Sequence, residues 1–246
     1  MSDYCLVVPC YNEERRLDVA AVERFLCDTP AVSMCFVNDG SADKTGEMLA
    51  ALAARWPERV LAFDMPVNGG KAEAVRQGML KAHAWRPVAF IGYWDADLAT
   101  PLDAILSFVD VLDERSRVVL VMGARVQLLG RRIVRKRTRH YLGRAFATAA
   151  SMTLRLPCYD TQCGAKLFRA TDVVRDAFRE PFISRWIFDV EIIARLVVDG
   201  SVDGRSGIYE FPLVRWEDAP GSKIGPSTWW IALLDLWRIR SEYFGR

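Results

Sequence analysis

Two aspartates, Asp95 and Asp97, stand directly after an apolar stretch that has the composition of a buried strand. A helical pattern follows them, so the pair is predicted to lie at the carboxyl end of that strand, where ligands of open α/β sheets bind. Two carboxylates in this position can hold a hard divalent cation, and the cation can hold a diphosphate. Because Asp-x-Asp is common on protein surfaces, the interpretation depends on what surrounds the pair.

The elements that must position this pair alternate between short apolar strands and longer helices. The expected strands cover residues 4–9, 32–38, about 59–64 and 88–94. The first helix is predicted to begin at Asn12, a good N-cap, and to run to about Leu26. Such alternation is typical of βαβ units and a mostly parallel sheet. Three strand ends carry polar clusters that should gather at one edge of this sheet. These clusters are residues 11–13, 38–41 and 95–97.

Composition and missing motifs exclude several classes of protein. The chain has 246 residues, 51% apolar and 26% charged, which suits a globular protein of one large or two small domains. No Gly-x-Gly-x-x-Gly follows the first strand and no P-loop motif occurs, which disfavours Rossmann dinucleotide and P-loop sites. Six cysteines without a Cys-x-x-Cys pair, and only two histidines, disfavour a zinc site. No signal-peptide core and no bilayer-spanning apolar run are present, so we expect a cytoplasmic protein without a transmembrane segment.

Charge is segregated along the chain, although the net charge is only +2. Between Arg115 and Tyr159 there are eleven Lys or Arg and no Asp or Glu. From Arg131 on, this segment is interpreted as a basic helix, and apolar residues interleave from Tyr141, which is typical of an amphipathic helix on a membrane surface. A solvated basic helix is the alternative. A nucleic-acid partner is not expected, because the aromatic residues form no obvious stacking platform.

The C-terminal tail is rich in tryptophan and leucine. Trp229, Leu233 and Trp237 fall on one helical face, while Asp235 and Arg238 argue against a bilayer-spanning helix. That face either packs on the core or anchors the protein at a membrane interface, where tryptophan is favoured.

Four segments resemble, in order and spacing, the family 2 inverting glycosyltransferases of the GT-A fold. They are residues 7–14, 37–41, 68–71 and 95–97. Residues 95–101 are most similar to dolichyl-phosphate glucose synthases and their polyprenyl-phosphate relatives, and three downstream segments extend the resemblance over nearly the whole chain. These segments are residues 161–169, 186–191 and 221–223. The resemblance implies one α/β domain over residues 1–246, Rossmann-like, with a central mixed, mostly parallel sheet and helices on both faces. Residues 1–125 would form the nucleotide-binding half and residues 126–246 the acceptor-binding half.

The resemblance also assigns site residues. Asp95 and Asp97 would hold Mg²⁺ or Mn²⁺ bridging the UDP phosphates, and Arg125 and Arg139 would bind the phosphate of a lipid acceptor. The nucleotide-sugar pocket would be completed by Pro9, Tyr11, Asn12, Glu13, Asp39, Lys71, Gln162 and Lys223.

Asp97, Asp189, Arg125 and Arg139 are the expected catalytic residues. Asp189 would be the general base for a hydroxyl acceptor. A phosphate acceptor needs no base, since its second pKa of about 6 leaves it largely dianionic, and Asp189 would then orient donor hydroxyls or the arginines. Two positions depart from the family pattern: Asn38 stands where many relatives have Asp, and Ala99 where some mannosyl-lipid-forming relatives have Gln.

The implied reaction is transfer of a sugar, expected to be glucose, from a UDP-sugar to a polyprenyl or dolichyl phosphate. It would take place on the cytoplasmic face of a membrane, to which the enzyme binds peripherally, and would give a β-linked product. A GDP-mannose donor and a glycan hydroxyl acceptor are the alternatives within the family. A non-catalytic nucleotide-sugar or nucleic-acid binding module is the alternative from another class.

Overall fold

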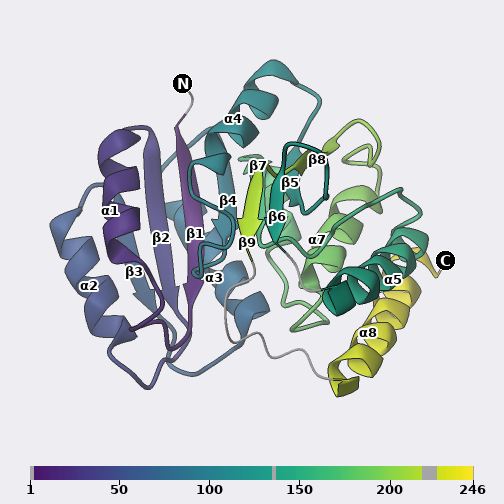
Figure 1. The fold of residues 1–246 in the computed structure, drawn as a ribbon, viewed down its shortest axis with the longest axis horizontal. Coiled ribbons are helices and arrows are strands. Elements are labelled where there is room, and N and C mark those ends of the chain that lie inside the picture. The colour runs from purple at the N-terminus through teal and green to yellow at the C-terminus, as the bar shows by residue number, and fades with distance from the viewer. Residues whose placement is uncertain (1–2, 135–136, 218–225, 246) are drawn as a thin grey trace.

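The computed structural model describes residues 3–134, 137–217 and 226–245, without the side chains of 137–140 and 226–229. Figure 1 shows one large sheet, a two-stranded ribbon and helices around them. The strands are β1 Tyr4–Cys10, β2 Val32–Asn38, β3 Val60–Asp64, β4 Phe90–Trp94, β5 Leu120–Ala124, β6 Arg132–Val134, β7 Ala165–Arg169, β8 Ile208–Pro212 and β9 Arg215–Glu217. The helices are α1 Val19–Asp28, α2 Thr45–Arg55, α3 Lys71–Trp85, α4 Ala104–Glu114, α5 Arg137–Leu154, α6 Asp172–Ala177, α7 Phe188–Val197 and α8 Pro226–Phe244.

The large sheet is mixed and mostly parallel, as predicted. Its strand order is β3-β2-β1-β4-β7-β5-β8, and β7 runs antiparallel to both of its neighbours, β4 and β5. The remaining pairs are parallel. Because β7 comes from the second half of the chain and lies between two strands of the first half, both halves build one continuous sheet.

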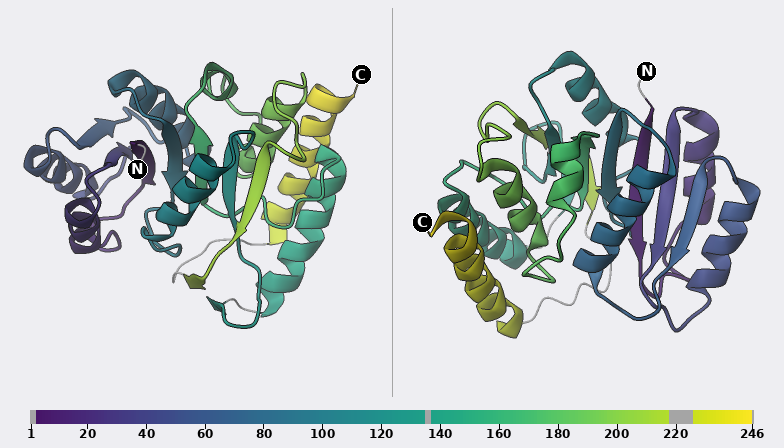
Figure 2. Two further views of the ribbon diagram at one scale, coloured as in Figure 1. Left: turned by 90° about the horizontal axis from the view of Figure 1, so that it is seen from above. Right: turned by 180° about the vertical axis from the view of Figure 1, so that it is seen from behind.

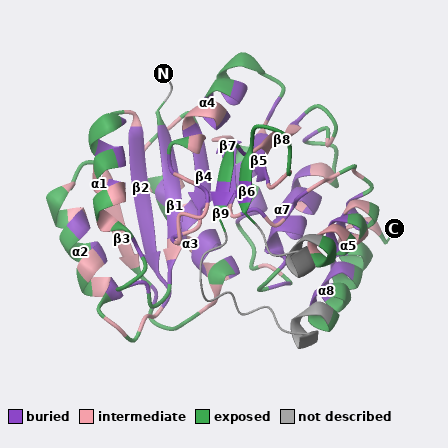
Figure 3. Cartoon of the chain, in the orientation of Figure 1, coloured by how far each residue is buried: buried purple, intermediate pink, exposed green. Residues whose placement is uncertain are grey.

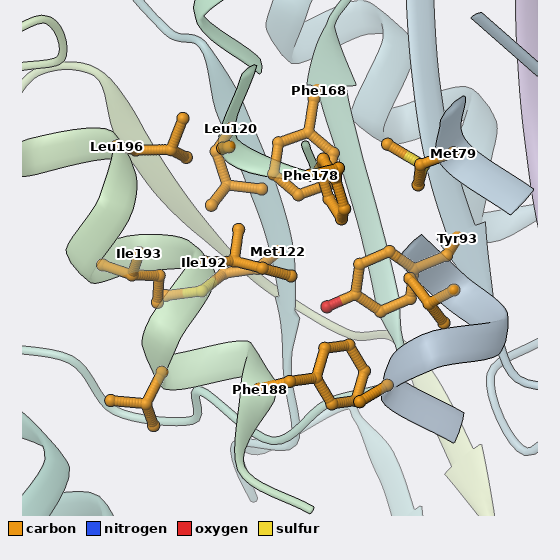
Figure 4. Packing of buried hydrophobic residues seen from close by; sticks show 14 of the residues in the cluster. Met79, Tyr93, Leu120, Met122, Phe168, Phe178, Phe188, Ile192, Ile193 and Leu196 are labelled. Carbon is orange, nitrogen blue, oxygen red and sulfur yellow. The ribbon is translucent and has the colours of Figure 1, made fainter. Parts of the chain in front are cut away.

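Alternation along the central strands sends side chains into two apolar layers. In β1, Cys5 and Val7 face the helices α3 and α5–α8, while Leu6 and Val8 face α1, α2 and α4. All four side chains are fully buried. The first layer contains the aromatic cluster of Tyr93, Phe168, Phe178 and Phe188 in Figure 4. Helices therefore cover both faces of the sheet, as expected for strands that are apolar on both sides.

The prediction that the first helix begins at Asn12 is wrong. The helix begins at Val19, where the Asp18 carboxylate accepts a hydrogen bond from Ala21 N at 2.8 Å as the N-cap. Asn12 has a left-handed backbone, φ 54°, a conformation that Asn tolerates better than most residues. Its side chain instead bonds to the loop that follows β2, because its amide oxygen accepts a hydrogen bond from Ala42 N at 2.9 Å.

The basic segment is also divided differently from the prediction. Arg132 belongs to the short strand β6, which pairs with β9, and α5 begins only at Arg137. The later part of α5 packs Phe146 and Ala150 on the core and exposes Tyr141 and Leu142, so the helix is amphipathic as expected.

Helix α8 lies beside α5 in both views of Figure 2. Its Ala232 and Leu236 pack on the core, whereas Leu233 and Trp237 are 42% and 67% exposed. The outer side of α8 is accordingly coloured as exposed in Figure 3. The described part of the predicted Leu233/Trp237 face therefore does not pack on the core, and the side chain of Trp229 lies outside the described residues. No helix within the described ranges has the length and hydropathy needed to cross a bilayer.

Candidate functional site

The loops that follow β1 and β2 are tied together at the carboxyl edge of the sheet. Asn12 N donates to Ser41 Oγ at 3.0 Å, and Glu13 N donates to Thr45 Oγ1 at 2.8 Å. Asp39 N donates to the carbonyl oxygen of Cys10 at 2.8 Å. The polar clusters after these two strands therefore meet at one edge, as the sequence predicts. Tyr11, which is 47% exposed, and the partly buried Pro9 lie on the same side, at the end of β1.

Asp39 fixes the loop that leads into α3. Its carboxylate accepts hydrogen bonds from Gly69 N at 2.6 Å, Gly70 N at 2.9 Å and Asn68 Nδ2 at 3.1 Å. Burial raises the pKa of Asp39, and the two glycine N–H groups offset part of that rise. Asp39 thus sets where α3, and its first residue Lys71, begins. A role for Asp39 toward a base or ribose stays a prediction.

Asn38 is explained by its neighbour in the sheet. Its side-chain amide donates to Asp64 Oδ1 at 2.7 Å, and its amide oxygen accepts from Ser41 N at 3.1 Å. An aspartate at position 38 would place a second carboxylate against Asp64 in a largely buried position, which is unfavourable. The departure from the family pattern therefore matches the residue that this chain has at position 64.

Asp95 meets Lys71 in front of the end of β4. The Lys71 Nζ lies 2.5 Å from Asp95 Oδ1, and Asp95 N donates to the carbonyl of Gly164 at 3.0 Å. Burial disfavours the ammonium, but the carboxylates of Asp95 and Asp189 outweigh it and raise the pKa of Lys71. Lys71 also stands at the N-terminus of a helix of 15 residues, where backbone N–H groups favour anions.

Asp97 and Glu13 add negative charge beside this pair. Burial, followed by the Asp95 charge, raises the pKa of Asp97, whose Oδ1 accepts from Ala99 N at 3.1 Å. Burial also raises the pKa of Glu13, and Asp97 and Asp95 contribute to that rise. Arg16 Nη1 lies 3.4 Å from Glu13 Oε1 and offsets the charge of that carboxylate. The carboxylates of Asp95 and Asp97 together still carry more charge than the ammonium of Lys71, which favours an added cation.

The donor set fits Mg²⁺ or Mn²⁺, which prefer oxygen ligands. Within the described residues, no three His, Cys, Asp or Glu side chains converge closely enough to hold a metal. Metal binding by Asp95 and Asp97, with phosphate and water completing the shell, stays a prediction.

A buried charge pair lies beneath this edge. Lys166 in β7 and Asp189 in the first turn of α7 are 0% and 4% exposed, and Lys166 Nζ lies 2.5 Å from Asp189 Oδ1. The same ammonium donates to the carbonyls of Thr161 at 2.9 Å and Cys163 at 2.7 Å, and the Tyr93 hydroxyl also donates to Asp189 Oδ1. Lys166 thereby joins Asp189 to the 161–163 loop. Sequence reasoning gave Lys166 no role.

Arg125 follows β5 and is paired with Asp160. Its guanidinium forms a two-pronged contact, Nε to Oδ2 at 2.6 Å and Nη2 to Oδ1 at 2.8 Å. Glu210 of β8 holds this loop by accepting from Tyr159 N at 2.8 Å and Asp160 N at 2.7 Å. Sequence reasoning did not pair Asp160 with Arg125 and gave Glu210 no role, although Asp160 directly precedes the 161–169 segment of the family resemblance. The side chain of Arg139 and the whole of Lys223 lie outside the described residues.

Several buried polar atoms at this edge have no hydrogen-bond partner in the described part of the chain. They are Glu13 Oε2, Thr161 Oγ1 and Gln162 Nε2. Buried polar atoms are normally paired, so unpaired ones that meet at a sheet edge indicate a place for a polar ligand. Three further atoms of this kind lie in other parts of the chain, on Tyr4, Trp56 and His83.

Gly164 gives a direct test of the position of Asp95. A Cβ at residue 164 would lie 2.0 Å from Asp95 Oδ2, so a methyl group there must displace the carboxylate. We expect Gly164→Ala to weaken Mn²⁺ binding about tenfold, which corresponds to about 1.4 kcal/mol. Isothermal titration calorimetry with Mn²⁺ measures this change, with Ala51→Ser, at an exposed position of α2, as the control. Unchanged Mn²⁺ affinity in Gly164→Ala would show that Asp95 does not hold the metal.

Several named relatives match most of this chain. A dolichyl-phosphate beta-glucosyltransferase of Trichomonas vaginalis is 31% identical over 245 residues, covering 95% of this chain and 69% of the relative. Its namesake in Drosophila melanogaster is 30% identical, covering 97% and 74%, and the one in Homo sapiens is 27% identical, covering 97% and 75%.

Solved structures show the same fold at low identity. Glucosyl-3-phosphoglycerate synthase from Mycobacterium tuberculosis, in complex with UDP, matches with a TM-score of 0.66 at 16% identity, covering 99% of this chain and 80% of that chain. Its complex with Mn²⁺, UDP and glucosyl-3-phosphoglycerate matches with a TM-score of 0.67 at 17% identity and the same coverage. These neighbours are GT-A glycosyltransferases, so the predicted GT-A fold is confirmed. The family model described as Glycosyl transferase family 2 matches residues 5–174. The chain is therefore a glycosyltransferase and belongs to glycosyl transferase family 2.

Proposed function

We propose that the protein transfers glucose from UDP-glucose to a polyprenyl or dolichyl phosphate and inverts the anomeric centre to give a β-linked lipid-phosphate sugar. The observation that carries the proposal is the edge where Asp95 and Asp97 meet Lys71. Two buried atoms of this edge, Glu13 Oε2 and Gln162 Nε2, have no hydrogen-bond partner among the described residues. Support for the acceptor and the sugar comes from the relatives, which are named dolichyl-phosphate beta-glucosyltransferases and match over most of this chain.

The donor would lie with its diphosphate between the aspartates and the start of α3. Asp95 and Asp97 would hold Mg²⁺ or Mn²⁺, which when bound offsets the charge that develops on the departing UDP. Lys71 and the N-terminal N–H groups of α3 add positive potential on the other side of the diphosphate. Gln162, whose amide nitrogen is buried without a partner in the described chain, is the group we assign to the donor sugar.

The acceptor would approach from the side of β5 and α5. An oxygen of the lipid phosphate attacks the anomeric carbon, the new C–O bond forms, and the electron pair of the broken bond leaves on UDP. Because the phosphate is largely ionised at neutral pH, no base has to remove a proton. Asp189 would then position groups at the reacting centre, held in place by Tyr93 and Lys166. Arg125, fixed by Asp160, and Arg139 would attract the acceptor phosphate.

Membrane binding is proposed for the surface formed by α5 and α8. Tyr141 and Met152 on α5 are 73% and 66% exposed, and Trp230 and Trp237 on α8 are 73% and 67% exposed. Tryptophan favours the membrane interface, and the basic residues of the segment from Arg115 to Tyr159 add attraction to anionic lipids. These features support peripheral binding to a membrane, and we place the enzyme on the cytoplasmic face as part of the proposal.

An acceptor panel with two variants tests the proposal against its rivals. The purified protein is assayed with UDP-glucose, other UDP-sugars and GDP-mannose against a short polyprenyl phosphate and an alkyl glycoside. We expect glucose transfer to the phosphate only, a loss of at least about tenfold in kcat/KM for Arg125→Gln, and measurable residual turnover for Asp189→Asn. Transfer to the glycoside, abolished by Asp189→Asn but little changed by Arg125→Gln, would instead establish a hydroxyl acceptor. Oligonucleotide binding without release of UDP would indicate a non-catalytic module.

A further inference from the structure

A concave surface lies against the C-terminal half of α5 and includes none of the residues assigned to the donor or to catalysis. This groove has a volume of about 520 Å³. Three arginines line it, together with apolar walls that include Met152, Leu156 and Pro157. The arginines are Arg144, Arg155 and Arg205, and no Asp or Glu lines the groove.

The three arginines form no ion pair within the described part of the chain. Arg144 donates to the carbonyl of Tyr159 at 2.9 Å, and its guanidinium lies 3.8 Å from the centre of the Tyr159 ring. Glu210, the carboxylate close enough to Arg144 to feel its charge, is already occupied by the N–H groups of Tyr159 and Asp160. Asp203 lies close enough to Arg205 to feel its charge, and its carboxylate already accepts hydrogen bonds from Arg205 N and Ser206 Oγ. Because neither carboxylate forms an ion pair with these arginines among the described residues, the guanidinium groups stay available to a ligand.

Arg155 is held in a backbone conformation that disfavours it. It directly follows the last residue of α5, in the position where helices commonly have glycine, and its φ is 55°. The turn around it is fixed, because Leu156 N donates to the carbonyl of Ser151 at 3.2 Å and Cys158 N donates to Ser151 Oγ at 3.0 Å. A long charged side chain at a strained backbone position indicates a use for that side chain.

Arg205 is brought to the groove by packing from another part of the chain. Asp203 closes its turn by accepting from Arg205 N at 3.0 Å and from Ser206 Oγ at 2.6 Å. Gly204 approaches Leu156 so closely that a Cβ there would lie 2.7 Å from the Leu156 methyl groups. The backbones that carry Arg155 and Arg205 are therefore fixed relative to one another.

We propose that this groove binds a phosphate-bearing anion through Arg144, Arg155 and Arg205. Guanidinium groups bind phosphate oxygens with strong, paired hydrogen bonds, and the apolar walls suit a ligand with an apolar portion next to its phosphate. An anionic phospholipid headgroup and a free organic phosphate share this chemistry. The binding requires neither a nucleotide sugar nor a metal, so it is measured apart from the proposed transfer reaction, and only its lipid arm shares Arg144 and Arg155 with the basic segment proposed to attract anionic lipids.

Binding is measured on the full chain without metal or nucleotide. The lipid arm uses co-sedimentation with vesicles of phosphatidylglycerol and phosphatidylcholine, and the soluble arm uses calorimetry with inorganic phosphate and glycerol 3-phosphate. We expect Arg155→Gly/Arg205→Gln to weaken binding to the phosphatidylglycerol vesicles, the soluble phosphates or both by about tenfold or more. The control, Arg24→Gln/Arg175→Gln, removes the same charge elsewhere and should change affinity less than about twofold.

Arg155→Gly alone separates a binding role from a structural one. Glycine suits the left-handed position, so its melting temperature should match or exceed that of the wild type while its affinity falls. Loss in the vesicle arm alone identifies a lipid headgroup, and loss in the soluble arm alone identifies a free phosphate. The proposal is overturned if the wild type binds neither probe, or if the double variant keeps wild-type affinity for both.

Discussion

Asp97→Asn is expected to lower the rate of glucosyl transfer by at least about 10²-fold. The Asp97 carboxylate is proposed to hold, with Asp95, the metal that stabilises the departing diphosphate, and such a metal contributes several kcal/mol to transition-state stabilisation. The same substitution should raise the stability of the metal-free protein at pH 7. Burial and the Asp95 charge raise the pKa of Asp97, so the ionised carboxylate is disfavoured in the folded state. Asparagine removes that charge and keeps an oxygen that can accept from Ala99 N.

The pH dependence of the melting temperature shows whether the ionised Asp97 carboxylate stabilises or destabilises the fold. A raised pKa means that the ionised Asp97 costs stability above its folded-state pKa, and that this cost disappears below the unfolded value of about 3.9. The melting temperatures of wild type and Asp97→Asn should therefore differ near pH 7 and converge as the pH falls to about 4. Added Mn²⁺ should stabilise the wild type more than the variant. Full activity of Asp97→Asn, or equal stabilisation of both proteins by Mn²⁺, would contradict the assigned metal role.

Lys166→Met is expected to lower the free energy of unfolding by about 3–5 kcal/mol, because it leaves the buried Asp189 charge without its ammonium partner. Lys166 is fully buried and its Nζ is bonded to Asp189 and to the carbonyls of Thr161 and Cys163. Chemical denaturation measures the change. Lys44→Met removes an exposed lysine and should stay within about 0.5 kcal/mol of the wild type.

A double variant shows whether the charge pair is the cause. Lys166→Met/Asp189→Asn removes both charges, while the asparagine can still accept from the Tyr93 hydroxyl, so it should be more stable than Lys166→Met alone. The losses of stability in Lys166→Met and Asp189→Asn could instead add up to the loss in the double variant, or Lys166→Met could lose less than about 1 kcal/mol. Either result would show that the charge pair is not the cause.

The parts of the fold that depend on local pattern could be predicted from the sequence. Strand composition and the polar residues after each strand predicted the parallel arrangement of β1–β4, and they predicted that Asp39 and Asp95 lie at one edge. Residues 165–169 were not predicted as a strand. Their pairing between β4 and β5 depends on contacts between distant segments, and nothing in the local pattern reports such contacts.

The polar contacts that hold the site in place could not be predicted from the sequence, because they also join distant segments. Asp160 is 35 residues from Arg125, and Glu210 is 50 residues from Asp160, so only the folded chain pairs them. Asn12 shows a local pattern that gave a wrong prediction. Its good N-cap propensity predicted a helix start, but contacts with Ser41 and Ala42 hold it in a loop instead. Propensity is a weak prior where a loop must fold over a ligand site.

One product analysis tests the proposed reaction most directly. The protein is incubated with UDP-glucose carrying ¹³C at the anomeric carbon, Mn²⁺ and a short polyprenyl phosphate, and the lipid product is examined by NMR. The proposed reaction gives a β-linked glucosyl phosphate in equal amount to UDP, and Asp97→Asn should form it at no more than about a hundredth of the wild-type rate. An α-linked product, or no lipid-linked sugar from this donor, would contradict it.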